Sequence, residues 1–203
     1  MMFAPYSINF YDEEVITWVT DRPSMVRRWI SSIKYIHRYR LRKLVVGLDV
    51  EWCPPHLSRD SQSPVATLQL CVGHRCLIFQ ILQADYIPSS LIRFLENGNY
   101  TFVGVGVRDD ARRLSKDYGL QVSRMVDLRG LAVTRLGEPP LAEAGLKRLG
   151  VRVLGKELEK LKVISYSEWD KEVLSEAQIE YACLDAFVSF ELGRVLRAAS
   201  FGR

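Results

Sequence analysis

The sequence predicts an α/β fold in which a mixed β-sheet is flanked by helices. Strand hairpins in the first part of the chain give way to alternating strands and helices, which is typical of this class. The longest apolar stretches are strand-sized and lie at residues 44–50 and 101–107. Neither run approaches the ~20 apolar residues that a membrane-spanning helix needs, so no membrane association is expected. The 203 residues are enough for a single domain with a sizeable core, and we expect one domain over residues 1–203.

The first half of the chain predicts mainly strands. Residues 7–20 alternate loosely around a turn at 11–14, and Arg22-Pro23-Ser24 opens a helix with apolar residues at helical spacing. Gly73-His74 separates two further apolar runs, which is a hairpin signal. The strands expected here span residues 44–52, 65–72, 75–81 and 101–107, with a helix over residues 91–96 between the last two.

The second half predicts mainly helices. A helix over residues 109–118, a short strand over 125–128 and a helix through Leu131 are followed by a helix over 141–149. Residues 151–170 are expected to be irregular. Ser175 and Gln178 form an S-x-x-Q capping box, which starts a last helix that runs to about Ala199.

Composition excludes several classes of site. The four cysteines form no C-x-x-C pair and only three histidines exist, so a zinc centre and histidine-driven catalysis are not expected. We expect reduced core thiols in an intracellular protein of the cytoplasm or nucleus, because residues 1–11 show no signal-peptide pattern. The net charge of +4 is mildly basic. The basic residues between positions 27 and 43, and Lys156, Lys160 and Lys162, are candidates for phosphate contacts; solvated surface is the alternative.

The segment Leu48-Asp49-Val50-Glu51 contains two acids that are candidates for metal binding. Side chains alternate along a strand, so Asp49 and Glu51 point to the same face of an apolar strand. Like charges at this separation repel, and burial raises the cost of each. A divalent cation with hard oxygen ligands, Mg²⁺ or Mn²⁺, would neutralise them. The alternative is a strand end at which both acids reach water.

Two further segments supply acids. Asp109 and Asp110 follow a predicted strand, where one of them is expected to serve the start of a helix. Tyr181 and Asp185 are four residues apart on the last helix and so share one face. Apolar residues surround Asp185, and a carboxylate in such a setting needs a partner.

In order and spacing, these segments resemble the motifs of the DEDD exonuclease superfamily in its tyrosine-containing subgroup, the Werner-syndrome-like and ribonuclease D group. The motifs are Asp49-x-Glu51, the segment from Val105 to Asp110, and Tyr181-x-x-x-Asp185, and the similarity covers about residues 44–196. A strand or hairpin and a helix precede this core.

The resemblance implies a ribonuclease H-like (DnaQ-like) fold and 3′-to-5′ hydrolysis of phosphodiesters that releases nucleoside 5′-monophosphates. It implies two Mg²⁺ or Mn²⁺ ions, with Asp49 bridging both, Glu51 and Asp185 on the first, and Asp110 ahead of Asp109 on the second. Tyr181 would orient the attacking water. Trp52 is a candidate to stack on a terminal base, and a core position is the alternative.

The overall pattern is most similar to small single-domain plant members of the family, some of which are similar to RISC-associated exoribonucleases. This narrower resemblance implies single-stranded RNA rather than DNA as substrate, ring-like homo-oligomers such as hexamers, and Argonaute proteins of RISC as partners. The alternative function is a nucleic-acid-binding or scaffold protein of the same fold without catalysis. The presence of all four carboxylates and the tyrosine favours an enzyme.

Overall fold

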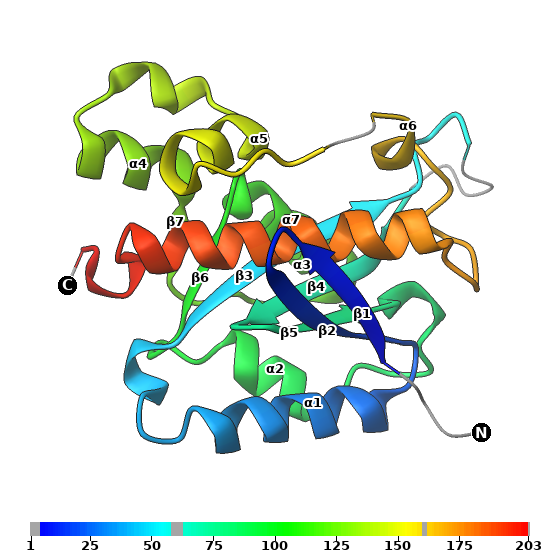
Figure 1. Ribbon diagram of the computed structural model, residues 1–203. Helices are drawn as coiled ribbons and strands as arrows, with labels where there is room; N and C mark the ends of the chain where they lie inside the picture. The colour runs from blue at the N-terminus through cyan, green and yellow to red at the C-terminus, as the bar shows by residue number, and fades with distance from the viewer. Residues whose placement is uncertain (1–4, 58–62, 160–161, 203) are drawn as a thin grey trace.

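The computed structural model describes residues 5–57, 63–159 and 162–202. Its centre is a mixed sheet with the strand order β1-β2-β5-β4-β3-β6-β7 (Figure 1). Pairing is antiparallel for β1/β2, β3/β4 and β4/β5, and parallel for β2/β5, β3/β6 and β6/β7. The strands are β1 (Tyr6–Phe10), β2 (Glu13–Thr20), β3 (Val45–Trp52), β4 (Val65–Val72), β5 (Arg75–Phe79), β6 (Thr101–Gly104) and β7 (Met125–Asp127).

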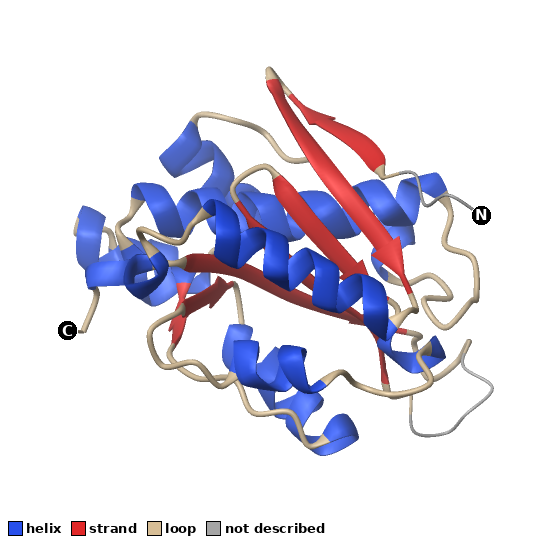
Figure 2. Cartoon of the chain, turned by 90° about the horizontal axis from the view of Figure 1, so that it is seen from below, coloured by secondary structure: helices blue, strands red, loops and turns tan. Residues whose placement is uncertain are grey.

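Helices cover both faces of this sheet. Seen from below, α1 crosses in front of the strands and α7 lies behind them (Figure 2). The α-helices are α1 (Pro23–Ile36), α2 (Ser89–Leu95), α3 (Val107–Tyr118), α4 (Leu128–Leu136), α5 (Leu146–Leu149), α6 (Lys162–Ser165) and α7 (Glu176–Val195). Shorter turns are η1 (Leu41–Lys43), η2 (Ile81–Gln83), η3 (Pro139–Glu143), η4 (Gly150–Leu154) and η5 (Ala198–Ser200). The predicted α/β class is confirmed.

Helix α7 lies very close to the middle of the sheet because two glycines permit the approach. A Cβ atom on Gly47 of β3 would lie 2.0 Å from the carbonyl oxygen of Ala186. A Cβ atom on Gly193 would lie 2.8 Å from a methyl group of Val103. This contact brings Asp185, next to Ala186, beside Asp49, two residues beyond Gly47.

Several local predictions are confirmed. The first residues form the β1–β2 hairpin, and α1 begins at Pro23. The hairpin around Gly73 is present as β4 and β5, and Cys71 and Cys76 lie opposite each other in its backbone register. The capping box at the start of α7 is complete, because Ser175 and Gln178 exchange hydrogen bonds. All four cysteines are free and buried, as expected for core thiols.

Other boundaries were predicted wrongly. The strand expected to reach residue 107 ends at Gly104, because Gly106 adopts φ 79° and α3 begins at Val107 rather than at residue 109. The single helix expected over 141–149 is broken into η3 and α5, which Ala144 and Gly145 separate in extended conformations. The helical backbone then continues past Gly150 as the π-type turn η4, within the segment expected to be irregular. No helix in the described ranges combines the length and apolarity that a bilayer crossing requires.

Candidate metal centre

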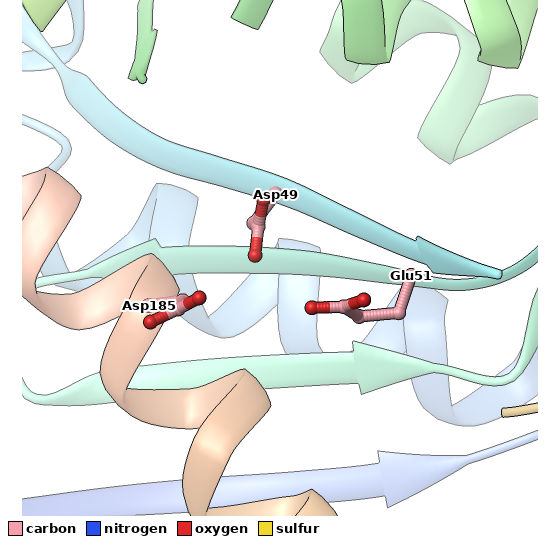
Figure 3. Close-up of side chains that lie close together, drawn as sticks. All are labelled: Asp49, Glu51 and Asp185. Atoms are coloured by element: carbon pink, nitrogen blue, oxygen red, sulfur yellow. The ribbon is translucent and has the colours of Figure 1, made fainter. Parts of the chain in front are cut away.

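Three carboxylates that are far apart in the sequence converge between β3 and α7. One oxygen from each of Asp49, Glu51 and Asp185 lies within 4.8 Å of the other two. Figure 3 shows the three side chains pointing toward one another, two from the strand and one from the helix. We call these residues the acidic cluster. The sequence predicted that they would meet, and the structure brings them together.

The local structure of each element aims these side chains. Asp49 and Glu51 lie on one side of β3 because strand side chains alternate. The pairing of β3 with β4 shifts register between Glu51 and Trp52, so the strand is irregular where the cluster lies. Glu51 and Asp185 are 9% and 4% exposed, so their charges are largely removed from water. Such burial of like charges is costly without a compensating cation.

Asp110 carries the clearest electrostatic signature of this region. It lies in the first turn of α3, and burial, followed by the negative charge of Asp49, raises its pKa to about 9. Its Oδ2 atom is buried and has no hydrogen-bond partner among the described residues. Asp109 differs, because it is exposed and forms an ion pair with Arg112 at 2.5 Å. The two neighbouring acids therefore have different environments, and Asp110 is the one whose pKa the charge of Asp49 raises.

Tyr181 lies one helical turn before Asp185 and is half-buried. Burial raises the pKa of its hydroxyl above the ordinary value, and the charges of Asp185, Glu51 and Asp49 raise it further. A hydrogen bond with Ser165 of α6 acts in the opposite direction. The phenol therefore stays protonated at neutral pH, so it serves as a hydrogen-bond donor and not as a proton acceptor.

The donor set fits a hard divalent cation. It consists of carboxylate oxygens alone, which Mg²⁺ and Mn²⁺ prefer. Burial and the charge of Asp49 raise the pKa of Asp110, and the opposing charge of Arg113 does not outweigh them. A divalent cation held by Asp49, Glu51 and Asp185 would offset the repulsion between them.

The ring of Trp52 is less open for stacking on a base than the sequence suggested. The guanidinium carbon of Arg113 lies 3.7 Å from the centroid of its ring, so one face of the half-buried indole is already covered. Arg113 also lowers the pKa of Asp110, which places a positive charge near that acid. Sequence reasoning missed Arg113, although it follows Asp110 by three residues on one helix, a spacing that shares a face.

The lysines expected to meet phosphates are placed only in part. The ammonium group of Lys156 lies 3.4 Å from Asp12 and 3.7 Å from Glu13, so its described partners are acids of the β1–β2 hairpin. Lys160 and the side chain of Lys162 lie outside the described residues. The basic segment at the end of α1 includes Arg38, which stacks on the exposed rings of Tyr35 and Tyr39.

Hydrogen bonds to Asp127, which the sequence did not predict, fix the start of α3. The carboxylate of Asp127 accepts hydrogen bonds from the backbone N–H of Gly106 at 3.0 Å and from Arg129, including its guanidinium at 2.7 Å. Burial tends to raise the pKa of Asp127, but the hydrogen bonds from Arg129 and Gly106 outweigh it and lower the pKa. The left-handed Gly106, and with it the first turn that carries Asp110, is fixed in this way.

Comparison with known proteins agrees with this geometry. The model of the 3′-5′ exonuclease family matches residues 19–199. A protein of Arabidopsis thaliana named 3′-5′ exonuclease is 35% identical over 153 residues, which are 75% of this chain and 52% of that protein. The human exonuclease 3′-5′ domain-containing protein 2 is 36% identical over 165 residues, which are 78% of this chain and 26% of that protein. The chain thus spans about half or less of the length of these curated relatives.

Two solved structures have a similar fold. The exonuclease domain of EXD2, soaked in Mn, is 28% identical, covers 90% of both chains and has a TM-score of 0.52. Ribonuclease D of Escherichia coli is 18% identical, covers 90% of this chain and 44% of its own, and has a TM-score of 0.71. At that identity the second match shows the fold alone, which is the ribonuclease H-like fold that the motifs implied.

Proposed function

The chain belongs to the 3′-5′ exonuclease family, and from this premise we propose that it removes nucleotides one at a time from the 3′ end of single-stranded nucleic acid, using divalent cations. The observation that carries the proposal is the convergence of Asp49, Glu51 and Asp185 beside the uncompensated carboxyl of Asp110. Four acids from three separate segments are costly to bring together in a metal-free core. They are useful where cations must be held against a phosphodiester.

Each residue has a distinct part in the proposed reaction. Asp49 would contact two cations, because its charge acts both on Asp110 and on Tyr181. Glu51 and Asp185 would complete the site of the first cation, and Asp110 that of the second. Bound cations supply a more acidic water and stabilise the charge that develops on the phosphate. The protonated Tyr181 would donate a hydrogen bond that orients the attacking water.

We favour single-stranded RNA as the substrate, with nucleoside 5′-monophosphates as products. We also propose a homo-oligomer that works with Argonaute in small-RNA pathways. The similarity of the motifs to small plant members of the family supports these finer points, and the Arabidopsis relative covers three quarters of the chain. Size-exclusion chromatography with light scattering tests the oligomer, and a mass several times 23.3 kDa is expected.

The activity itself is tested with 5′-labelled single-stranded RNA and DNA of one sequence, in Mg²⁺, Mn²⁺ or EDTA. We expect a ladder with one-nucleotide steps that requires metal, with faster loss of the RNA. Asp49→Asn should reduce the rate by roughly a thousandfold or more, because it removes the charge shared between both cation sites. Its melting temperature should not fall, since the substitution relieves repulsion. Tight binding by the wild type without any cleavage would overturn the proposal in favour of an inactive scaffold.

A further inference from the structure

A cavity of about 370 Å³ adjoins the acidic cluster, and the first hairpin of the chain forms one of its walls. Asn9, Phe10 and Tyr11 line it on the side of the hairpin, and Tyr181 and Asp185 line it on the side of α7. In the view of Figure 1, the turn of this hairpin passes in front of α7. The volume lies in the range of small-molecule sites. Strand β1 lies outside residues 19–199, so the family pattern does not account for this wall.

Tyr11 is held in a defined place at the tip of the hairpin. Its hydroxyl accepts a hydrogen bond from the backbone N–H of Glu157 at 2.8 Å. Its backbone adopts φ 57°, a conformation that is unfavourable for an aromatic residue and persists only where the surroundings impose it. The preceding Phe10 is buried and packs edge-on against Phe187 of α7, with ring centroids 6.2 Å apart. Tyr11 is nevertheless 59% exposed as a residue. The ammonium group of Lys156 lies 5.6 Å from the centroid of its ring, farther than Arg113 lies from Trp52, so an anchored and largely open aromatic side chain borders the cavity.

The charge of the lining limits what the cavity can accept. Glu157, Glu159 and Glu180 border it together with Asp185, and the described lining side chains include no Lys, Arg or His. A phosphate would be repelled there unless cations neutralised the acids. Sugar hydroxyls and base amino groups are hydrogen-bond donors, and carboxylates accept from them. The cavity is therefore suited to the uncharged part of a nucleotide.

We propose that this cavity receives the sugar and base of the terminal nucleotide, and that Tyr11 is a positioning residue that stacks on it. The inference rests on the proposed function, which puts the scissile phosphate at the acidic cluster. In the hairpin-side wall, Tyr11 offers an exposed ring whose orientation is fixed at its hydroxyl and at its backbone. A ring fixed in this way loses little freedom when a base stacks on it.

Three variants test this role. Tyr11→Asn removes the ring and keeps a residue type that tolerates positive φ, so the turn should survive. Tyr11→Phe keeps the ring and loses the hydrogen bond to Glu157. Tyr6→Ala is the matched control, because Tyr6 lies on strand β1 of the same hairpin, is 41% exposed and borders a different cavity.

Two readouts are measured on the full chain: KM and kcat for 5′-labelled single-stranded RNA, and binding of AMP and UMP with Mn²⁺ by calorimetry. We expect Tyr11→Asn to raise KM and weaken nucleotide binding about tenfold, with kcat within about threefold of wild type. Tyr11→Phe should retain most of the affinity, and Tyr6→Ala should match wild type. Unchanged KM and nucleotide affinity in Tyr11→Asn would overturn the role of Tyr11 while leaving the nuclease intact. If Tyr11→Asn lowers only kcat and the melting temperature, the role of Tyr11 in binding is likewise overturned and the nuclease activity stands. A wild type that does not cleave but binds AMP through Tyr11 would refute the nuclease and retain the cavity.

Discussion

Asp127 and Asp110 lie close together at one end of the sheet, and the protein shifts their pKa values in opposite directions. Asp127 ends β7 and accepts hydrogen bonds from Arg129 and from the backbone of Gly106, so its pKa is lowered despite burial. Asp110 lies in the first turn of α3, where burial and the charge of Asp49 raise its pKa to about 9. The fold neutralises one acid with its own groups and leaves the other uncompensated. The first supports the fold, and the second is the acid that we propose to hold a cation.

The largest expected effect separates Asp110 from its neighbour. Asp110→Asn should lower the rate of RNA hydrolysis about a hundredfold, because it removes a charge from the second cation site. Asp109→Asn should stay within about twofold, since Asp109 is exposed and its pair with Arg112 is a surface ion pair of small value. Initial rates in Mg²⁺ measure both. Equal losses in the two variants would contradict the assignment of Asp110.

A smaller effect is expected at Tyr181. Tyr181→Phe should lower kcat about tenfold, because the donated hydrogen bond to the attacking water is lost, and leave Mn²⁺ affinity unchanged. The hydroxyl stays protonated, so no new pH dependence should appear in the range from 6 to about 9. Single-turnover rates across this range measure the effect. If Tyr181→Phe is as fast as wild type, Tyr181 is only a packing residue.

The smallest effect concerns the stability of the metal-free protein. The folded-state pKa of Asp110 is raised, so its contribution to stability is present below the ordinary carboxyl pKa and is lost as pH rises toward 9. Asp110→Asn should therefore be more stable than wild type at pH 8 and similar to it near pH 4. Asp127 has a lowered pKa, so its contribution is present at neutral pH and is lost as pH falls.

Thermal unfolding in EDTA at pH 4 and pH 8 measures both trends. Asp127→Asn should be less stable than wild type at pH 8, with the difference shrinking toward pH 4. A destabilised Asp110→Asn at pH 8 would show that the protein compensates this carboxyl after all. The comparison between the two acids would then fail.

The sequence predicts the parts of this site that depend on local spacing. Alternation along a strand puts Asp49 and Glu51 on one side, and helical spacing puts Tyr181 one turn before Asp185. Contacts between distant segments are harder to predict. The sequence around each segment does not indicate that β2 pairs with β5, or that Tyr11 contacts the backbone of Glu157. The strand expected to reach residue 107 was too long because a run of Val and Gly does not reveal the left-handed Gly106. The distinction between Asp127 and Asp110 depends on partners that only the fold brings together.

The central claim is that the uncompensated acids hold divalent cations, and a Mn²⁺ titration followed by electron paramagnetic resonance tests it most directly. The free-ion signal reports how many ions each chain of wild type, Asp49→Asn, Asp110→Asn and Asp127→Asn removes from solution. We predict about two ions for wild type and Asp127→Asn, about one for Asp110→Asn and none for Asp49→Asn. Binding by Asp49→Asn equal to that of the wild type would contradict the account.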